Sequence, residues 1–183
     1  MAHVGKLPPV NRFITTHNED AKAVFSTAVS EESKMAEIPG NMGFALSYTT
    51  KGFPVDLNND KDIDIYKPFL ESPPGLTVSN GTVLRHVDLA PDTTCPMHRT
   101  VSLDYGICVE GEFELILDSG ETRRMKRGDV AVQRATMHAW RNPSRTEWAR
   151  MVFVLQVCKP VDVGGRTLGE AFETEMTGVP ASH

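Results

Sequence analysis

Long hydrophobic runs are absent from this sequence. The longest covers residues 151–155 and ends at Gln156, whereas a transmembrane helix needs about 20 consecutive apolar residues. Residues 1–8 contain no apolar segment of the kind that defines a secretory signal. We therefore expect a cytoplasmic protein that does not enter a membrane.

Cysteine is also scarce, and basic residues do not outnumber acidic ones. Cys95, Cys108 and Cys158 are three in number and show no CxxC spacing, so we interpret them as free thiols in a reducing compartment. The formal net charge is −5, with acidic and basic residues mixed along the chain. This distribution argues against a nucleic-acid partner, which would require a basic face.

The composition that remains is that of a globular domain. Hydrophobic residues make up 40% of the 183 residues and charged residues 23%, which is enough to bury a core.

The region 1–75 is expected to form an N-terminal arm with strands and a long loop. Within it, residues 12–16 and 22–26 form either a hairpin or, from Asn18 onward, part of a helix. Residues 51–75 are rich in proline and glycine and predict a loop.

From residue 76 onward, short strands alternate with turn signals. The expected strands cover residues 82–89, 113–117, 121–125, 130–133, 138–142 and 149–157. Many short strands with frequent turns predict an all-β, closed or two-sheet antiparallel architecture. We assign residues 76–160 to this barrel core and residues 161–183 to a C-terminal tail with a short helix near 168–175.

Two histidines and a carboxylate stand where strand geometry can bring them together. Alternate residues of a strand share a face, so His98, Thr100 and, in a continued strand, Asp104 point the same way. His138 and Trp140 share a face on a later strand. With both faces inward, His98, Asp104 and His138 meet in one cavity, where such groups can hold a metal ion or move protons. Arg85 and His86 lie on opposite faces of one strand, so at most one of them enters this cavity.

At these residues the chain resembles the cupins. Asp92, His98, Asp104 and Gly111 follow the spacing of the first cupin motif, and Gly128, His138 and Asn142 follow the second. The resemblance covers about residues 76–157 and is strongest to small single-domain cupins of secondary metabolism. It implies a jelly-roll barrel (a double-stranded β-helix), a hairpin rather than a helix in the N-terminal arm, and a homodimer.

The chain departs from the cupin pattern at two positions. A typical cupin holds its metal with three histidines and one glutamate, but Thr100 replaces the second histidine and Asp104 the glutamate. The resemblance leaves His98, Asp104 and His138 as ligands of a divalent iron, manganese, zinc or nickel ion. Thr100, Gln133 and Trp140 are expected to contact the substrate instead.

The sequence supports three functional hypotheses. The first is an enzyme acting on a small carbonyl or carboxylate metabolite of polyketide type by metal-assisted proton transfer or bond cleavage, as a decarboxylase, dehydratase or isomerase. His98, Asp104 and His138 would then be the catalytic residues. The second is an iron-dependent dioxygenase with the same site, and the third is a metal-free cupin that binds a small molecule.

Overall fold

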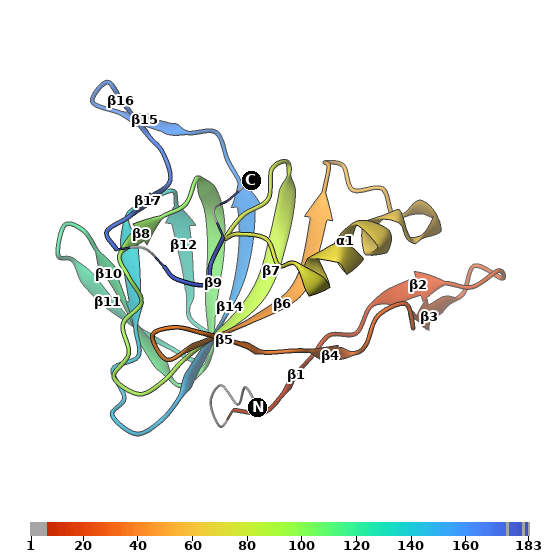
Figure 1. Cartoon of the computed structure of the whole chain (residues 1–183), viewed down its shortest axis with the longest axis horizontal. Coiled ribbons are helices and arrows are strands. Elements are labelled where there is room, and N and C mark those ends of the chain that lie inside the picture. Colours follow the sequence, from red (N-terminus) through yellow and green to blue (C-terminus); the bar gives the residue numbers. More distant parts are fainter. Residues whose placement is uncertain (1–6, 175, 181, 183) are drawn as a thin grey trace.

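Two antiparallel sheets face each other and form the barrel, as Figure 1 shows in the computed structural model, which describes residues 7–174, 176–180 and 182. The larger sheet contains, in spatial order, β12 (Val130–Arg134), β9 (Ser102–Glu110), β14 (Ala149–Val157), β7 (Gly81–Leu89), β6 (Met42–Lys51) and β5 (Ala36–Ile38). The smaller sheet contains β11 (Thr122–Lys126), β10 (Glu112–Leu117), β13 (His138–Arg141), β8 (His98–Arg99) and β17 (Ala171–Phe172). The predicted all-β barrel is confirmed.

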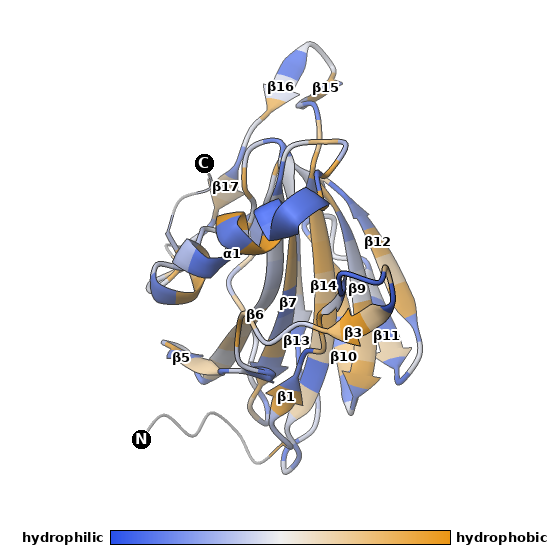
Figure 2. Ribbon diagram, turned by 90° about the vertical axis from the view of Figure 1, so that its right-hand side faces the viewer, coloured by the Kyte–Doolittle hydropathy of each residue, from blue (hydrophilic) through white to orange (hydrophobic). Residues whose placement is uncertain are grey.

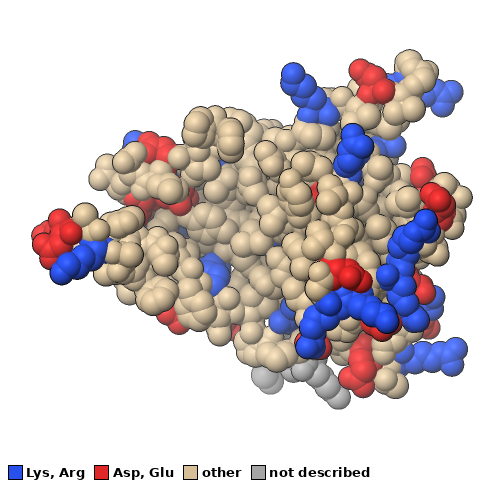
Figure 3. Space-filling model, turned by 180° about the vertical axis from the view of Figure 1, so that it is seen from behind, with Lys and Arg blue, Asp and Glu red and all other residues tan. Residues whose placement is uncertain are grey.

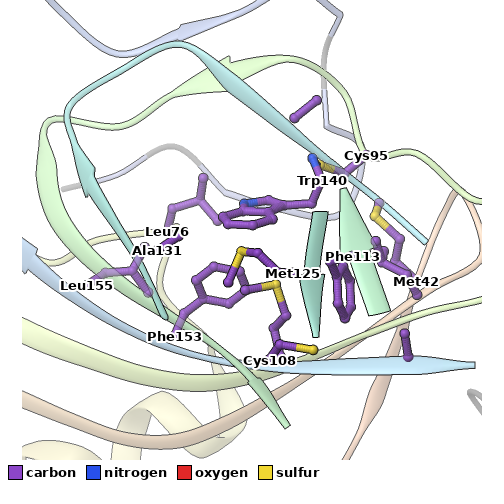
Figure 4. Packing of buried hydrophobic residues seen from close by; sticks show 14 of the residues in the cluster. Met42, Leu76, Cys95, Cys108, Phe113, Met125, Ala131, Trp140, Phe153 and Leu155 are labelled. Carbon is purple, nitrogen blue, oxygen red and sulfur yellow. The ribbon is translucent and has the colours of Figure 1, made fainter. Parts of the chain in front are cut away.

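The core fills the space between the sheets because apolar residues alternate along the strands (Figure 2). On β14, Ala149, Met151, Phe153 and Leu155 are buried, while the residues between them are more exposed. Figure 4 shows side chains from both sheets, including Trp140 and Phe153, packed together in this space.

The N-terminal arm consists of two small antiparallel pairs. β1 (Val10–Asn11) pairs with β4 (Glu32–Ser33), and β2 (Thr15–His17) pairs with β3 (Ala23–Phe25). The hairpin prediction for this region is thus confirmed and the helix alternative is wrong. The side chain of Asn18 explains the outcome, because its Oδ1 accepts hydrogen bonds from the backbone N–H groups of Asp20 and Lys22 and so stabilises a turn.

The loop predicted for residues 51–75 is wrong in its second half. This segment contains a 3₁₀ turn, η1 (Asn58–Asp60), and a helix, α1 (Lys61–Glu71), which lies against β6 (Figure 1). Ile63 and Tyr66 are three positions apart and both are buried against the barrel. Among the described residues, no helix is long and apolar enough to cross a membrane.

The helix predicted near residues 168–175 is also wrong, although residue 175 itself lies outside the described residues. β15 (Val161–Val163) and β16 (Arg166–Leu168) form a projecting hairpin, and β17 then pairs with β8 at the edge of the smaller sheet (Figure 1). The backbone N–H of Glu173 extends this contact by donating to the carbonyl of Met97 at 2.9 Å. Pairing with an open sheet edge satisfies the backbone groups of this segment without a helix.

Gly111, the glycine between β9 and β10, is expected to tolerate no side chain. Its φ is +71°, and an added Cβ would lie 2.9 Å from the Cβ of Ala149. Gly111→Ala should therefore lower the free energy of unfolding by about 1–3 kcal/mol, measured by urea denaturation. Gly120→Ala is the matched control, because Gly120 has a φ of +85° but no atom within 4 Å of the added Cβ. Equal losses in the two variants would show that the contact with Ala149 is unimportant.

Candidate active site

A small cavity lies between the two sheets, and its wall is mainly apolar. Its volume is about 50 Å³. Apolar side chains from five strands contribute most of the lining, among them Met42, Leu89, Phe113, Trp140 and Phe153. His98, Thr100, Asp104 and His138 also line it. Five of the six predicted site residues, Trp140 included, are therefore brought to one cavity.

His98 and His138 are direct neighbours across the smaller sheet. They form the registered pair between β8 and β13, and their ring centroids are 4.4 Å apart. Both residues are buried. The sequence predicted that both residues face the inside of one barrel, and the pairing of β8 with β13 places the two imidazoles side by side.

The backbone fixes the tautomer of each histidine. His98 Nδ1 lies 2.8 Å from the carbonyl oxygen of Pro96, and His138 Nδ1 lies 2.9 Å from that of Thr136. Because a carbonyl only accepts hydrogen bonds, each Nδ1 carries a proton, and in the neutral ring each Nε2 has a lone pair. Burial lowers the pKa of His98, and burial together with the adjacent His98 lowers the pKa of His138 to about 3. Both rings are therefore neutral at physiological pH.

Asp104 offers one bound and one free carboxylate oxygen. Thr100 Oγ1 donates to Asp104 Oδ2 at 3.3 Å, and Ser102 Oγ donates to Thr100 Oγ1 at 2.7 Å. The other oxygen, Oδ1, is buried and has no hydrogen-bond partner among the described residues. Burial, partly offset by these hydroxyl groups, raises the pKa of Asp104 to about 6. A carboxylate of this pKa can both gain and lose a proton near neutral pH.

The remaining two predicted residues have different surroundings. Trp140 packs edge-on against His138 and Phe153, with ring centroids 5.7 and 5.5 Å away. Gln133 is buried beside Asp104 in the register of β12 and β9, but it does not belong to the cavity lining. Its Oε1 accepts a hydrogen bond from the hydroxyl group of Thr136.

Two further residues reach the site from outside the predicted set. Arg85 lines the cavity, whereas His86 points to the other face of β7 and contacts the Ser47 hydroxyl at 2.8 Å. Strand alternation predicted that only one of Arg85 and His86 points into the cavity, but it could not show which one. Phe172 on β17 stacks on His98, with centroids 6.1 Å apart and ring planes at 12°. The short segment around Phe172 carries no sequence signal for this contact.

The three predicted metal ligands are not assembled into a metal-binding group. Across residues 7–174, 176–180 and 182, no three histidine, cysteine, aspartate or glutamate side chains lie close enough together to hold one ion. His98 and His138 supply two donors, but Asp104 has a shorter side chain than glutamate, and Thr100 holds one of its oxygens. Catalytic metal sites ordinarily have three protein ligands. The residues present therefore do not fit the predicted ion, and we assign no chemical step to a metal.

The arrangement is suited to proton transfer. It combines a carboxylate whose pKa is raised to about 6 with two neutral imidazoles in a small, mainly apolar cavity. Acid–base catalysis is most effective when the pKa of the catalytic group lies close to the working pH.

Comparisons with known proteins agree with this fold. The family described as the cupin domain matches residues 85–155. Phomopsin biosynthesis cluster protein C' of Diaporthe leptostromiformis is 50% identical over 159 residues, covering 87% of this chain and 84% of the relative. The cupin-domain-containing oxidoreductase virC of Hypocrea virens is 47% identical over 154 residues, covering 82% and 77%. The solved cupin domain of Schizosaccharomyces pombe Cnp3 aligns with a TM-score of 0.50 at 11% identity, covering 81% of this chain and 88% of that one.

Proposed function

The chain belongs to the cupin family, and we propose that it is an enzyme of secondary metabolism that transfers protons on a small, largely apolar carbonyl compound. Its relatives include proteins named for the phomopsin and oryzine biosynthesis clusters. The observation that carries the proposal is the free Oδ1 of buried Asp104, in the same cavity as two neutral histidines.

Asp104 is the group that moves the proton. In its ionised form, Oδ1 removes a proton from a carbon next to a carbonyl, while Thr100 holds Oδ2 and so fixes the carboxylate. The protonated carboxyl then returns the proton to the product. The Nε2 atoms of His98 and His138 each accept a hydrogen bond from a hydroxyl group of the substrate, because each Nδ1 is already bound to the backbone.

An isomerase or a dehydratase removes such a proton, and a decarboxylase delivers one to the carbon from which CO2 has left. The apolar wall, with Trp140 and Phe153, excludes water and strengthens the electrostatic effect of the few polar groups inside. A carbonyl compound with an acidic neighbouring C–H is therefore the substrate class that the cavity fits best.

Hydrogen–deuterium exchange tests the reaction class without knowledge of the natural substrate. The protein is incubated in deuterium oxide with small aromatic ketones, 2-tetralone and 4-acetylbenzoate, and mass spectrometry follows deuterium incorporation next to the carbonyl. The wild type should accelerate exchange, and Asp104→Asn, which lacks the base, should slow it. Exchange no faster than with serum albumin would contradict the proposal.

Removal of metal ions is expected to leave this exchange intact. Because no third protein ligand accompanies His98 and His138 in the described part of the chain, dialysis against EDTA should change the exchange rate by less than about twofold, well below the 10²–10⁴-fold of acid–base catalysis. The measurement is repeated after adding back iron, manganese, zinc or nickel. If exchange is lost after dialysis and one of these ions restores it, this prediction is contradicted and the predicted metal site is supported.

A second candidate is an oxidation. It is favoured by the names of several relatives, which are called cupin-domain-containing oxidoreductases. Consumption of oxygen that depends on a small-molecule substrate and on iron would identify this activity, whereas exchange that continues without oxygen supports proton transfer.

A further inference from the structure

Arg85 is a buried arginine without a charged partner. It points inward from β7, one of the central strands of the larger sheet, and only 5% of its surface is exposed. Its Nη2 donates to the carbonyl of Gly75 at 2.7 Å, and its guanidinium lies over the ring of Phe44, 5.3 Å from the centroid. Its Nε has no partner among the residues that the structure describes.

The charge of this guanidinium is not neutralised by the protein. Within the described chain, the carboxylates that form ion pairs lie against other basic residues, and none is within 4.0 Å of Arg85. Burial lowers its pKa to about 10, so it remains charged at neutral pH. An unpaired buried charge is costly to the fold. A binding role would account for its presence.

Arg85 also lies where two hollows meet. It lines the inner cavity of about 50 Å³ and an outer groove of about 1020 Å³. The groove runs between the N-terminal arm, the end of α1, Pro73–Pro74 and residues 178–180. Figure 3 shows a hollowed face whose middle is mostly uncharged, with charged side chains gathered toward its two ends.

The sizes of the two hollows indicate how a ligand would lie. The inner cavity holds only a small group, because pockets for ordinary small ligands have volumes of about 300–1,000 Å³. The body of a larger ligand must extend past Arg85 into the groove. Phe44 and Leu46, with Phe69 of α1, give the groove apolar surface for such a body.

We propose that Arg85 binds the carboxylate of the substrate, an apolar organic acid that enters through the groove. This assignment rests on the proposed function and specifies its substrate class. The free donors of a guanidinium match the two oxygens of a carboxylate. A single guanidinium neutralises one negative charge, which suits a carboxylate better than a doubly charged phosphate. The carbonyl end of the acid then lies in the cavity with Asp104 and the two histidines.

A matched pair of probes tests the assignment. 2-Naphthoate and 2-naphthamide have the same ring and nearly the same size, but only the first is charged. Titration calorimetry on the wild type should give a dissociation constant at least about tenfold lower for naphthoate, as expected for hydrogen bonds to a charged group. Equal affinities for the two probes, or binding of neither, would overturn the proposal without any variant.

Two variants test whether Arg85 causes the preference for naphthoate over naphthamide. Arg85→Leu should abolish it, whereas Arg134→Leu, which removes the same charge from an exposed position on β12, should keep it. Arg85→Leu should also melt no lower than the wild type, because it removes an unpaired buried charge. A preference for naphthoate that persists in Arg85→Leu, with or without a drop in the melting temperature of that variant, would assign Arg85 a structural role and overturn the proposal.

The outcomes also separate this proposal from the proposed function. If 2-tetralone, which has no carboxylate, exchanges deuterium while naphthoate is not preferred, only the role of Arg85 is overturned. If naphthoate is preferred and neither ketone exchanges, the carboxylate site stands and proton transfer is overturned.

Discussion

Asp104→Asn should lower the rate of deuterium exchange by about 10²–10⁴-fold, the range that acid–base catalysis contributes. Asparagine is close in shape to aspartate and can keep the contact with Thr100, but it cannot take up a proton at Oδ1. The loss should therefore appear in the rate and not in the fold. Mass spectrometry on 2-tetralone gives the rate, and circular dichroism checks the barrel.

The pH dependence of the wild type supplies an independent readout. The base acts in its ionised form, and burial raises the pKa of Asp104 to about 6. The exchange rate should therefore fall as the pH is lowered through about 6. Asp118→Asn, in the exposed turn after β10, is the control and should leave both rate and pH profile unchanged. A wild-type rate that does not change between pH 5 and pH 8, or a fully active Asp104→Asn, would be incompatible with Asp104 as the base.

The same raised pKa predicts the effect on stability. The pKa of Asp104 is higher in the folded chain than its ordinary value of 3.8, so the folded state is favoured below about pH 4 and loses this advantage as the pH rises through about 6. The loss is on the order of 3 kcal/mol. Asp104→Asn should thus be no less stable than the wild type at pH 7, as urea denaturation can show.

Arg150→Leu should lower the free energy of unfolding by about 3–5 kcal/mol, because it leaves a buried carboxylate without its partner. Asp88 is fully buried. Arg150 donates to both of its oxygens, Nε to Oδ1 at 2.6 Å and Nη2 to Oδ2 at 2.7 Å. Its Nη1 also donates to the carbonyl of Pro8 at 2.8 Å, which attaches the N-terminal arm to the barrel. Urea denaturation at pH 7 measures the loss.

A surface ion pair is the appropriate control for this variant. Arg127 pairs with Glu110, and the two side chains are 67% and 44% exposed. Arg127→Leu should cost no more than about 1 kcal/mol, the usual limit for an exposed pair. If the two variants lost similar stability, the burial of Asp88 would not account for the loss in Arg150→Leu.

Much of the barrel could be predicted from the sequence because its strands are short, alternating and separated by clear turns. The strand predicted for residues 149–157 coincides with β14, and that for 138–142 differs from β13 by one residue. The approach of His98 to His138 was also predictable. Strand alternation and the two motifs place both residues on inner faces of one barrel.

The features that could not be predicted depend on contacts between distant segments. α1 contains Pro68 and follows a segment rich in proline and glycine, which obscured its helical period. β17 is two residues long and exists because the edge of β8 is open to it. The choice between Arg85 and His86 depends on the register of β7, which strand alternation alone leaves undetermined. The contact of Thr100 with Asp104, and the lack of a three-donor group around His98 and His138 in the described residues, are likewise not revealed by spacing alone.

The stacking of Phe172 on His98 has a consequence for how such a protein could diversify. Phe172 belongs to the tail and stacks on His98, and Met176, also of the tail, lines the cavity. The strands that carry His98, Asp104 and His138 belong to the barrel. The candidate reactive groups are thus held by the two sheets, whereas the ring stacked on His98 and one side chain of the cavity wall come from the tail. Changes in this tail are therefore expected to alter which molecules the cavity accepts while leaving the proposed proton-transfer groups in place.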